Sequence, residues 1–526
     1  ETVNPIADEL VFTVAPEDRS VLTRLQEYAL RGDDALELTL EDSLRIAMER
    51  ADEYRFAEEN YVLAGLRLLI ERHRWGPRFF NDTTATVTST GDEGMYDSAL
   101  QLVNDFRVTQ RLPYGGEVSA RALARTTQDL HNYVAGQNTA SADIILEADL
   151  PLLRGAGITA REDRIQAERD VIYAARSFER FRREFLVSVA RDYLNLVVDR
   201  KRIENNVRQV ESLEELQARE QALYRKGRKT RFDAALAENE TVEAKDRLNS
   251  ALERYRLAVD RFKVRIGLPP EQAVVLRPSA LALPVPETSL NESVATALNL
   301  RLDLQTRRDQ IDDSRRDVLI ARNNLLPDLD LRGSATLSTD DDEAYGIPDF
   351  DTDEGRFLAS VTLSAPIDRE IEYLGLRQAQ IGLERTGRSY DDFRDDIVIS
   401  VRGAVRDIDR ALLSLEIQER NVAIARQRLD SINADPSRAT VRDSSDAVNA
   451  LLSAQDSRDA ALRDVQLAIL DYLLVTGQLR VTGSGEIRPL PGMPNDLTPD
   501  VEADEYDPGE RQRTFERIFS ESSPQE

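Results

Sequence analysis

Apolar residues recur every seven positions in two widely separated stretches of the sequence. The first series is Val189, Leu196, Ile203 and Val210, and the second is Val401, Ile408, Leu415, Val422 and Leu429. A sustained seven-residue repeat is typical of helices that pack along their whole length. The two series are in register, because an offset of 212 residues (401 − 189) takes the first onto the second. The pattern therefore predicts two long helices in two related halves of the chain.

The two long helices are expected from about Ile158 to Tyr224 and from about Tyr373 to Ile432. At a rise of 1.5 Å per residue, about 65 residues form a rod of roughly 100 Å. Returning helices are expected from about Arg231 to Ile266 and from Arg442 to Thr476. Two such hairpins in one chain indicate an elongated molecule rather than a compact enzyme.

Composition excludes several classes of function. The net charge of −27 argues against a nucleic-acid partner, because binding phosphates needs a basic surface. The chain has no cysteine, which excludes disulfides, thiolate zinc sites and a lipid-modified cysteine. With only two histidines, far apart in sequence, we predict no enzymatic activity, no metal site and no cofactor. No segment of the sequence approaches 18 consecutive apolar residues, so no transmembrane helix is expected.

Between the helices the apolar period changes from seven to two. From about Phe80 to Leu152 the chain is expected to form strands, in which Leu100, Leu102 and Phe106 alternate with polar neighbours. A half-buried sheet in a soluble domain and a strand of a membrane barrel give the same weak alternation. The strands lie between long helices and have no helix of their own to cover them, which favours the membrane.

The second half repeats this order of elements. In the first half a helix is expected from about Leu38 to Arg74, before the strands. In the second half a helix is expected from Leu290 to about Asn324, followed by strands over about 327–367. We divide the chain into an extended N-terminal arm (1–37), a first repeat (38–270), a linker (271–289), a second repeat (290–480) and a disordered acidic tail (481–526). The strands of the first repeat are expected at about 80–152, and the helical hairpins at 158–266 and 371–476.

Short motifs at the element boundaries carry a family resemblance. Leu326–Leu331 (LPDLDL) is similar to a helix-to-strand transition, and Leu150–Gly155 (LPLLRG) and Leu363–Asp368 (LSAPID) resemble strand-to-helix transitions. Gly227–Asp233 and Thr440–Ala450 resemble two hairpin tips. In this order, over residues 38–480, the chain resembles the TolC family of outer-membrane efflux and secretion channels.

The resemblance implies an α+β membrane protein: a trimeric β-barrel continued by a long α-helical coiled-coil barrel, with two internal repeats per protomer. It implies the exit duct of a tripartite efflux pump or a type I secretion system, two alternatives that stay open. The implied partners are two further copies of the chain, outer-membrane lipid, a periplasmic adaptor (membrane fusion) protein and an inner-membrane transporter. The implied location is the outer membrane of a Gram-negative bacterium, with the helices in the periplasm and the signal peptide already removed.

The same resemblance assigns a periplasmic gate. It implies that Arg442 and Asp233 pair to hold the tunnel closed, and that Asp446 contributes to an acidic constriction. Asn449 stands where some members carry a second aspartate, which predicts a weaker acidic ring. An exposed pair of this kind contributes about 0–1 kcal/mol, so several around a threefold axis are needed to close the gate.

Docking of the adaptor is assigned to the two hairpin tips. The implied residues are Gly227 and Thr230 in the first tip, and Thr440 in the second. Thr440 is interpreted as standing in place of the family's usual glycine, which makes docking at the second tip the weaker expectation.

One departure from the family is an additional hairpin. Ser98–Arg111 and Glu117–Thr126 look like two strands joined by a tight turn, whereas the family contributes four strands per protomer. This hairpin either extends the barrel or decorates its rim, and we favour four membrane strands. The alternative function is a soluble, elongated coiled-coil scaffold with small β-domains, which periodicity alone does not exclude.

Overall fold

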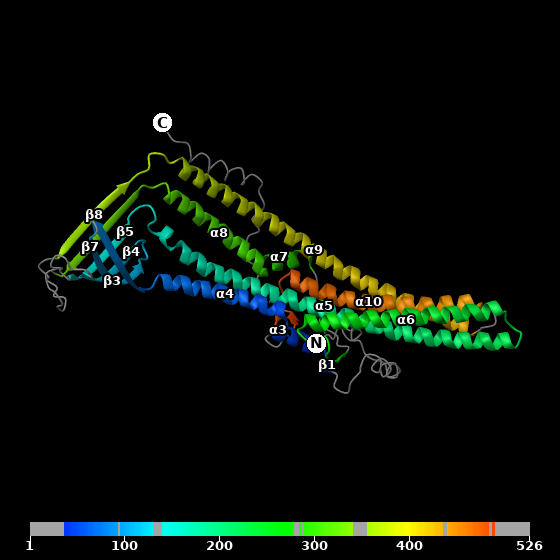
Figure 1. Ribbon diagram of the computed structural model, residues 1–526. Coiled ribbons are helices and arrows are strands. Elements are labelled where there is room, and N and C mark those ends of the chain that lie inside the picture. Colours follow the sequence, from blue (N-terminus) through cyan, green and yellow to red (C-terminus); the bar gives the residue numbers. More distant parts are fainter. Residues whose placement is uncertain are drawn as a thin grey trace.

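The computed structural model describes residues 36–92, 95–129, 139–277, 283, 285–286, 289–339, 355–434, 439–482 and 487–489. Most of the predicted arm (1–37) and of the predicted tail (481–526) lies outside these residues. The molecule is elongated, with a β-sheet at one end and the turns of two helical hairpins at the other (Figure 1).

Two long helices run through most of this length. They are α5 (Ile158–Arg225) and α9 (Glu370–Ala434), of 68 and 65 residues. They return through α6 (Arg231–Arg265) and α10 (Val441–Val475), so all four predicted helices are confirmed to within three residues at their ends. The heptad residues are buried as expected, apart from the half-buried Leu429 at the end of the second series.

Each strand region is preceded by two helices where the sequence predicts one. In the first half these are α3 (Leu40–Arg50) and α4 (Asp52–Arg74), and in the second they are α7 (Leu290–Leu300) and α8 (Leu302–Asn323). The breaks fall at Ala51 and Arg301, single extended residues with ψ of 127° and 117°. Neither residue is a helix breaker, so the cause lies in the packing around them.

A glycine packs against each break. Gly267, just after α6, has φ of 83°, and a Cβ added to it would lie 2.6 Å from the backbone of Arg50. Gly477, just after α10, has φ of 74°, and a Cβ added to it would make a tight contact of 3.3 Å with Leu300. The returning helices therefore end where α3 and α7 end. On the sheet side of this level α4, α5, α8 and α9 pack in sequence, and on the other side α6, α5, α10 and α9 do (Figure 1).

The largest hydrophobic core lies at this level. Tyr193 of α5 is completely buried in it, and its hydroxyl donates to the carbonyl oxygens of Leu38 and Arg277. These carbonyls flank a small parallel pairing of β1 (Leu36–Leu38) with β6 (Val274–Leu276). The end of the predicted arm and part of the predicted linker are therefore strands that close the core.

The predicted tail also begins with structure. Strand β9 (Leu479–Val481) pairs antiparallel with β10 (Ile487–Pro489). Arg182 of α5 donates to the carbonyl oxygens of Val481 and Thr482, at 2.9 and 2.8 Å. The start of the region predicted as disordered is thus fastened to the long helix.

The main sheet is antiparallel, and within the described residues it has six strands in the order β2-β3-β4-β5-β7-β8. The strands are β2 (Arg78–Asp92), β3 (Met95–Arg111), β4 (Glu117–Asp129), β5 (Thr139–Pro151), β7 (Asp328–Ser338) and β8 (Arg356–Ser364). The sheet therefore has two strands more than the four that we favoured for the membrane. The additional hairpin, β3–β4, lies inside the sheet between β2 and β5 and does not decorate its rim, because both of its outer edges are paired.

Candidate functional site

The register of the main sheet separates its side chains into two faces. Residues paired across strands point to the same side, and successive residues alternate. We call one side the apolar face, and among the described side chains it carries no Asp, Glu, Lys or Arg. Its larger residues are Phe79, Val87, Leu100, Leu102, Phe106, Val108, Val118, Ile144, Leu146, Leu150, Leu329, Leu331, Leu337, Phe357, Val361 and Leu363.

The apolar face is uncovered in the single chain. Phe79 is 67% exposed, Phe357 79% and Leu363 66%. The described helices lie beyond one end of the strands, and none packs over the sheet (Figure 1). A contiguous apolar surface of this size marks contact with a partner or a membrane. The face needs an apolar environment that the described part of the chain does not supply.

The opposite side, the polar face, carries both signs of charge. Among the described strand side chains it has seven arginines and eight carboxylates, a net charge of −1 (7 − 8). Opposite charges pair across strands: Arg121 with Asp105 at 2.5 Å, Arg332 with Asp149 at 3.2 Å, Arg125 with Asp143 at 3.5 Å and Arg78 with Glu117 at 4.0 Å. The polar face is therefore suited to water and nearly neutral.

The first and last strands leave open edges. Within the described residues, β2 pairs only with β3 and β8 only with β7, so each keeps one row of backbone groups without a strand partner. Such an edge is a template for pairing with another chain. Strand β2 runs away from the helices and β8 toward them, so the two edges are suited to antiparallel pairing with each other in neighbouring copies.

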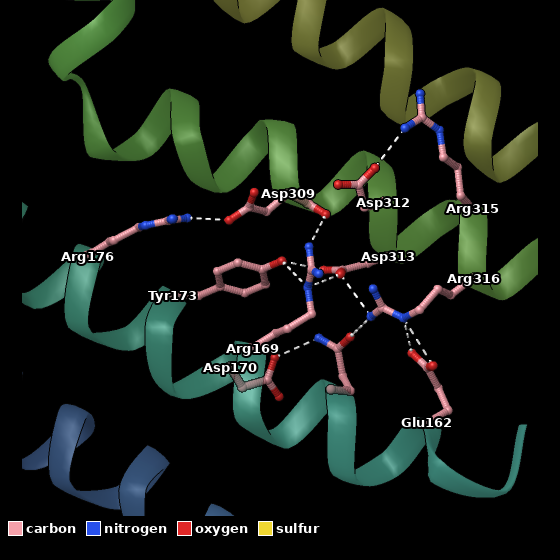
Figure 2. Close-up of polar contacts among 11 residues, drawn as sticks. Glu162, Arg169, Asp170, Tyr173, Arg176, Asp309, Asp312, Asp313, Arg315 and Arg316 are labelled. Atoms are coloured by element: carbon pink, nitrogen blue, oxygen red, sulfur yellow. Dashed lines mark hydrogen bonds and ion pairs between the residues drawn. The ribbon is translucent and has the colours of Figure 1, made fainter. Parts of the chain in front are cut away.

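A set of ion pairs fastens α8 to α5 next to the sheet (Figure 2). Arg169 contacts Asp313 at 2.5 Å, and the Tyr173 hydroxyl donates to the same carboxylate at 2.6 Å. Burial, with the hydrogen bond to Asp313 next in importance, raises the pKa of Tyr173 to about 12. This tyrosine stays a hydrogen-bond donor at any physiological pH. Two further pairs extend the contact: Arg176 with Asp309 and Arg316 with Glu162.

The first hairpin tip is formed by a glycine turn and a capping box. Gly227 has φ of 71° and follows the end of α5. Thr230 caps α6: its hydroxyl accepts from the Asp233 N–H, and the Asp233 carboxylate accepts from the Thr230 N–H at 3.0 Å. The Thr230 hydroxyl also donates to this carboxylate at 2.8 Å, and this hydrogen bond, followed by the one from the Thr230 N–H, holds the pKa of Asp233 below its ordinary value of 3.8. The carboxylate that we predicted for the gate is thus engaged in capping its own helix.

The second tip contains the same capping box. Thr440 caps α10 and Asp443 completes the box. Thr440 thus has the structural role of Thr230, and our alignment of Thr440 with a tip glycine such as Gly227 was wrong. The turn that precedes Thr440, residues 435–438, lies outside the described residues.

The other predicted gate residues lie on the first turns of α10. Arg442 and Asp446 are both exposed. In the part of the chain that the structure describes, no hydrogen bond or ion pair joins Arg442 to Asp233. Asn449 accepts a hydrogen bond from Gln209, so its side chain faces α5. The gate and the docking tips remain predictions, because a single chain contains no contact between copies.

Sequence reasoning missed a buried polar contact between α5 and α10. The Asn205 side-chain amide donates to Asp456 at 2.8 Å and to Asp459 at 3.3 Å. Burial raises the pKa of Asp456. Asp456 and Asp459 are three positions apart, which places them on one face of a helix, and a face exposed to water shows the same spacing. The signal that could have found the contact is the polar Asn205, which interrupts the apolar seam of α5.

Two further observations concern the described residues alone. None of the described helices is long and apolar enough to cross a lipid bilayer. In the same residues no group of three or more His, Cys, Asp and Glu side chains is arranged to hold a metal ion.

Solved structures with the same architecture are outer-membrane proteins. VceC of Vibrio cholerae superimposes with a TM-score of 0.62 and 14% identity, over 83% of this chain and 96% of that one. The MtrE outer membrane channel of Neisseria gonorrhoeae, in its open state, gives 0.60 and 15%, over 83% and 88%. The CmeC outer membrane channel of Campylobacter jejuni gives 0.58 and 15%, over 83% and 85%.

The chain has the fold of these outer-membrane channels. The resemblance predicted from the sequence is thereby confirmed at the level of the fold. No protein-family model matches the sequence, and a search of curated proteins found no match. The channel fold is therefore carried by the order, lengths and packing of the elements rather than by sequence identity.

Proposed function

We propose that the chain is one subunit of a homotrimeric outer-membrane channel. The observation that carries this proposal is the apolar face of the main sheet, which has no ionisable side chain among its described residues and no helix over it. Water on one side and lipid on the other match the two faces of the sheet. The likeness of the fold to outer-membrane channels supports the same conclusion.

A single sheet cannot remain open in lipid. Each backbone N–H or C=O left unpaired in hydrocarbon costs several kcal/mol, so the open edges of β2 and β8 must pair. Pairing β8 of one copy with β2 of the next, three times, leaves no edge. The polar faces then line a water-filled lumen and the apolar faces contact lipid.

The helices continue this assembly outside the lipid. Each chain contributes two helical hairpins, one per structural repeat, and three chains form a coiled-coil barrel in the periplasm. Apolar side chains that are exposed on α4 support contact between neighbouring copies: Phe56, Leu63, Leu66, Leu69 and Ile70. The hairpins are extended enough to cross an aqueous gap, because 68 residues of helix measure about 100 Å.

The hairpin tips are the site of control. We assign them to a periplasmic adaptor and an inner-membrane transporter, through Gly227, Thr230 and Thr440. Arg442 holds the tunnel closed by pairing with Asp233, and Asp446 contributes to an acidic constriction. The adaptor shifts the tunnel toward its open state only by as much as the adaptor binds the open state more tightly than the closed one. The assembly serves as the exit duct of a tripartite efflux pump or of type I secretion.

Reconstitution tests the proposed function. The purified chain is expected to need detergent for solubility and to give discrete current steps when added to planar lipid bilayers. A soluble scaffold would stay in solution in plain buffer and leave the bilayer silent, and that result would overturn the proposal.

A further inference from the structure

The hairpin β3–β4 is built as part of the wall of the sheet. Strand β3 pairs with β2 from Met95 to Thr109 and with β4 from Ala99 to Arg111, and β4 pairs with β5 from Glu117 to Thr127. Both strands keep the alternation of the sheet, with Leu102 and Ala122 on the apolar face and Asp105 and Arg121 paired on the polar face. Nothing distinguishes these strands from their neighbours.

The turn of this hairpin is fastened to the helical part of the chain. The Gly157 N–H, at the start of α5, donates to the Tyr114 carbonyl oxygen at 2.8 Å. Gly116 has φ of 86°, and a Cβ added there would lie 2.0 Å from the Asp149 carbonyl oxygen. The turn therefore lies at the junction of β5 and α5, and the hairpin starts at the same level as the other strands.

The stagger of the strands has the value that a closed barrel requires. When paired residues are followed from strand to strand, Arg78 at the helix-side end of β2 lies level with Leu358 of β8. Strand β8 continues six residues further, to its helix-side end at Ser364 (364 − 358). Six residues over the five steps between the described strands correspond to a tilt of about 40°, taking about 3.3 Å per residue and 4.8 Å per step. Closed barrels have tilts of about 35–45°.

We infer, on the basis of the channel proposed above, that three copies close a barrel of eighteen strands (3 × 6), taking the six described strands of each chain. At a tilt of about 40° and a strand spacing of about 4.8 Å, eighteen strands give a backbone diameter of about 36 Å. Four strands per chain would give about 24 Å by the same geometry. The additional hairpin widens the exit by half.

The wider exit has a consequence for the cargo. Side chains of the polar face take about 5 Å on each side, because packed sheets lie about 10 Å apart, which leaves a bore of roughly 25 Å. The wall is close to neutral, with seven arginines and eight carboxylates among the described side chains of each chain. The barrel thus admits bulky hydrated solutes of either charge, and selection by size or charge falls to the helical tunnel.

Imaging of the protein in lipid nanodiscs tests this inference. The unaltered protein is expected to show a threefold particle with a barrel about 36 Å across. The matched variant lacks residues 95–129, so that β2 is followed directly by β5; this keeps the strands antiparallel and should narrow the barrel to about 24 Å. A threefold particle with a barrel of about 24 Å in the unaltered protein would refute the eighteen strands and leave the channel intact. Absence of a threefold particle would instead refute the proposed function.

Cysteine labelling tests the inference without the deletion. The chain has no cysteine of its own, so Ala124→Cys on the apolar face and Arg125→Cys on the polar face of β4 can be compared directly. In nanodiscs a membrane-impermeant maleimide should label Arg125→Cys and leave Ala124→Cys at least tenfold less labelled. Equal labelling of both would show that the hairpin lies outside the wall and would overturn the inference.

Discussion

A charge placed on the apolar face should destabilise the protein only if that face contacts lipid. Leu146 in β5 lies on the apolar face with a side chain that is 52% exposed, and its neighbour Ile145 points to the polar face. Leu146→Arg therefore puts a guanidinium into lipid, whereas Ile145→Arg puts the same group into the lumen. The two variants match in chemistry and in position along the strand.

The expected cost follows from the depth of Leu146. It lies five residues from Pro151, the helix-side end of β5 (151 − 146). At about 3.3 Å per residue and a tilt of about 40°, this is about 13 Å above that end, near the middle of an apolar band about 25 Å tall. An arginine at the midplane costs about 2–4 kcal/mol, or about 6–12 kcal/mol for a trimer.

Urea unfolding of protein folded into phospholipid vesicles measures this cost. We expect Leu146→Arg to lower the free energy of unfolding by about 2–4 kcal/mol per chain and Ile145→Arg to change it by less than about 1 kcal/mol. In a water-soluble scaffold, Leu146→Arg would be an ordinary surface substitution with an effect within about 0.5 kcal/mol. Equal effects of the two variants would refute the assignment of the faces.

Four further predictions concern the helical part. Arg442→Ser should raise single-channel conductance in planar bilayers, and an unchanged conductance would remove this residue from the gate. Thr230→Ala should destabilise the first turn of α6 by about 1 kcal/mol, seen as faster amide hydrogen exchange there, whereas Thr230→Asn should retain protection. Because its folded pKa lies below 3.8, Asp233 stabilises this turn fully above that pH, and the protection factors of the turn, taken against unfolded peptide at the same pH, should fall as pH falls through the lowered pKa. Protection that is insensitive to acid would contradict this. Asp303→Asn removes the carboxylate that Arg301 contacts at 2.6 Å, and a thermal or urea titration should show a loss of about 1–3 kcal/mol; no loss would contradict the pairing.

The long helices and the faces of the strands were predictable because both depend on local periodicity. A seven-residue apolar repeat specifies a packed helix wherever it occurs, and alternation specifies a two-sided strand. The heptad residues Val189 and Val401 are completely buried, as the repeat requires. Even Ile145, which interrupts the alternation of β5, keeps its place on the polar face.

The features that were missed depend on contacts between distant segments. Ala51 and Arg301 are compatible with a helix, and the breaks there coincide with the packing of Gly267 and Gly477 against the adjacent residues. The short parallel pairing of β1 with β6 joins residues more than 200 positions apart, and three-residue strands carry no periodicity. No local signal predicts either feature.

The sequence does contain signals for the position of the additional hairpin and for the roles of the threonines at the tips. Glu117–Thr126 has the alternation of its neighbours, and this argued for the wall over a rim decoration. The capping boxes carry a sequence signature, threonine followed three residues later by aspartate, at Thr230–Asp233 and Thr440–Asp443. This signature relates Thr440 to Thr230 without any structure.

Closure of the sheet between copies is tested most directly by a disulfide across the open edges. Ala85 in β2 and Ala359 in β8 lie on the apolar face, and antiparallel pairing that continues the stagger brings them together in neighbouring copies. Within one chain the five strand steps between them alone amount to about 24 Å, whereas a disulfide needs Cα atoms within about 7 Å.

On oxidation in lipid, the Ala85→Cys, Ala359→Cys double variant is expected to form covalent dimers and trimers and nothing larger, because the third bond closes the ring. Pairing Ala85→Cys with Phe357→Cys covers the neighbouring register, and the single variants serve as controls. A chain that stays monomeric in both double variants, or a ladder that continues beyond three, would contradict the account.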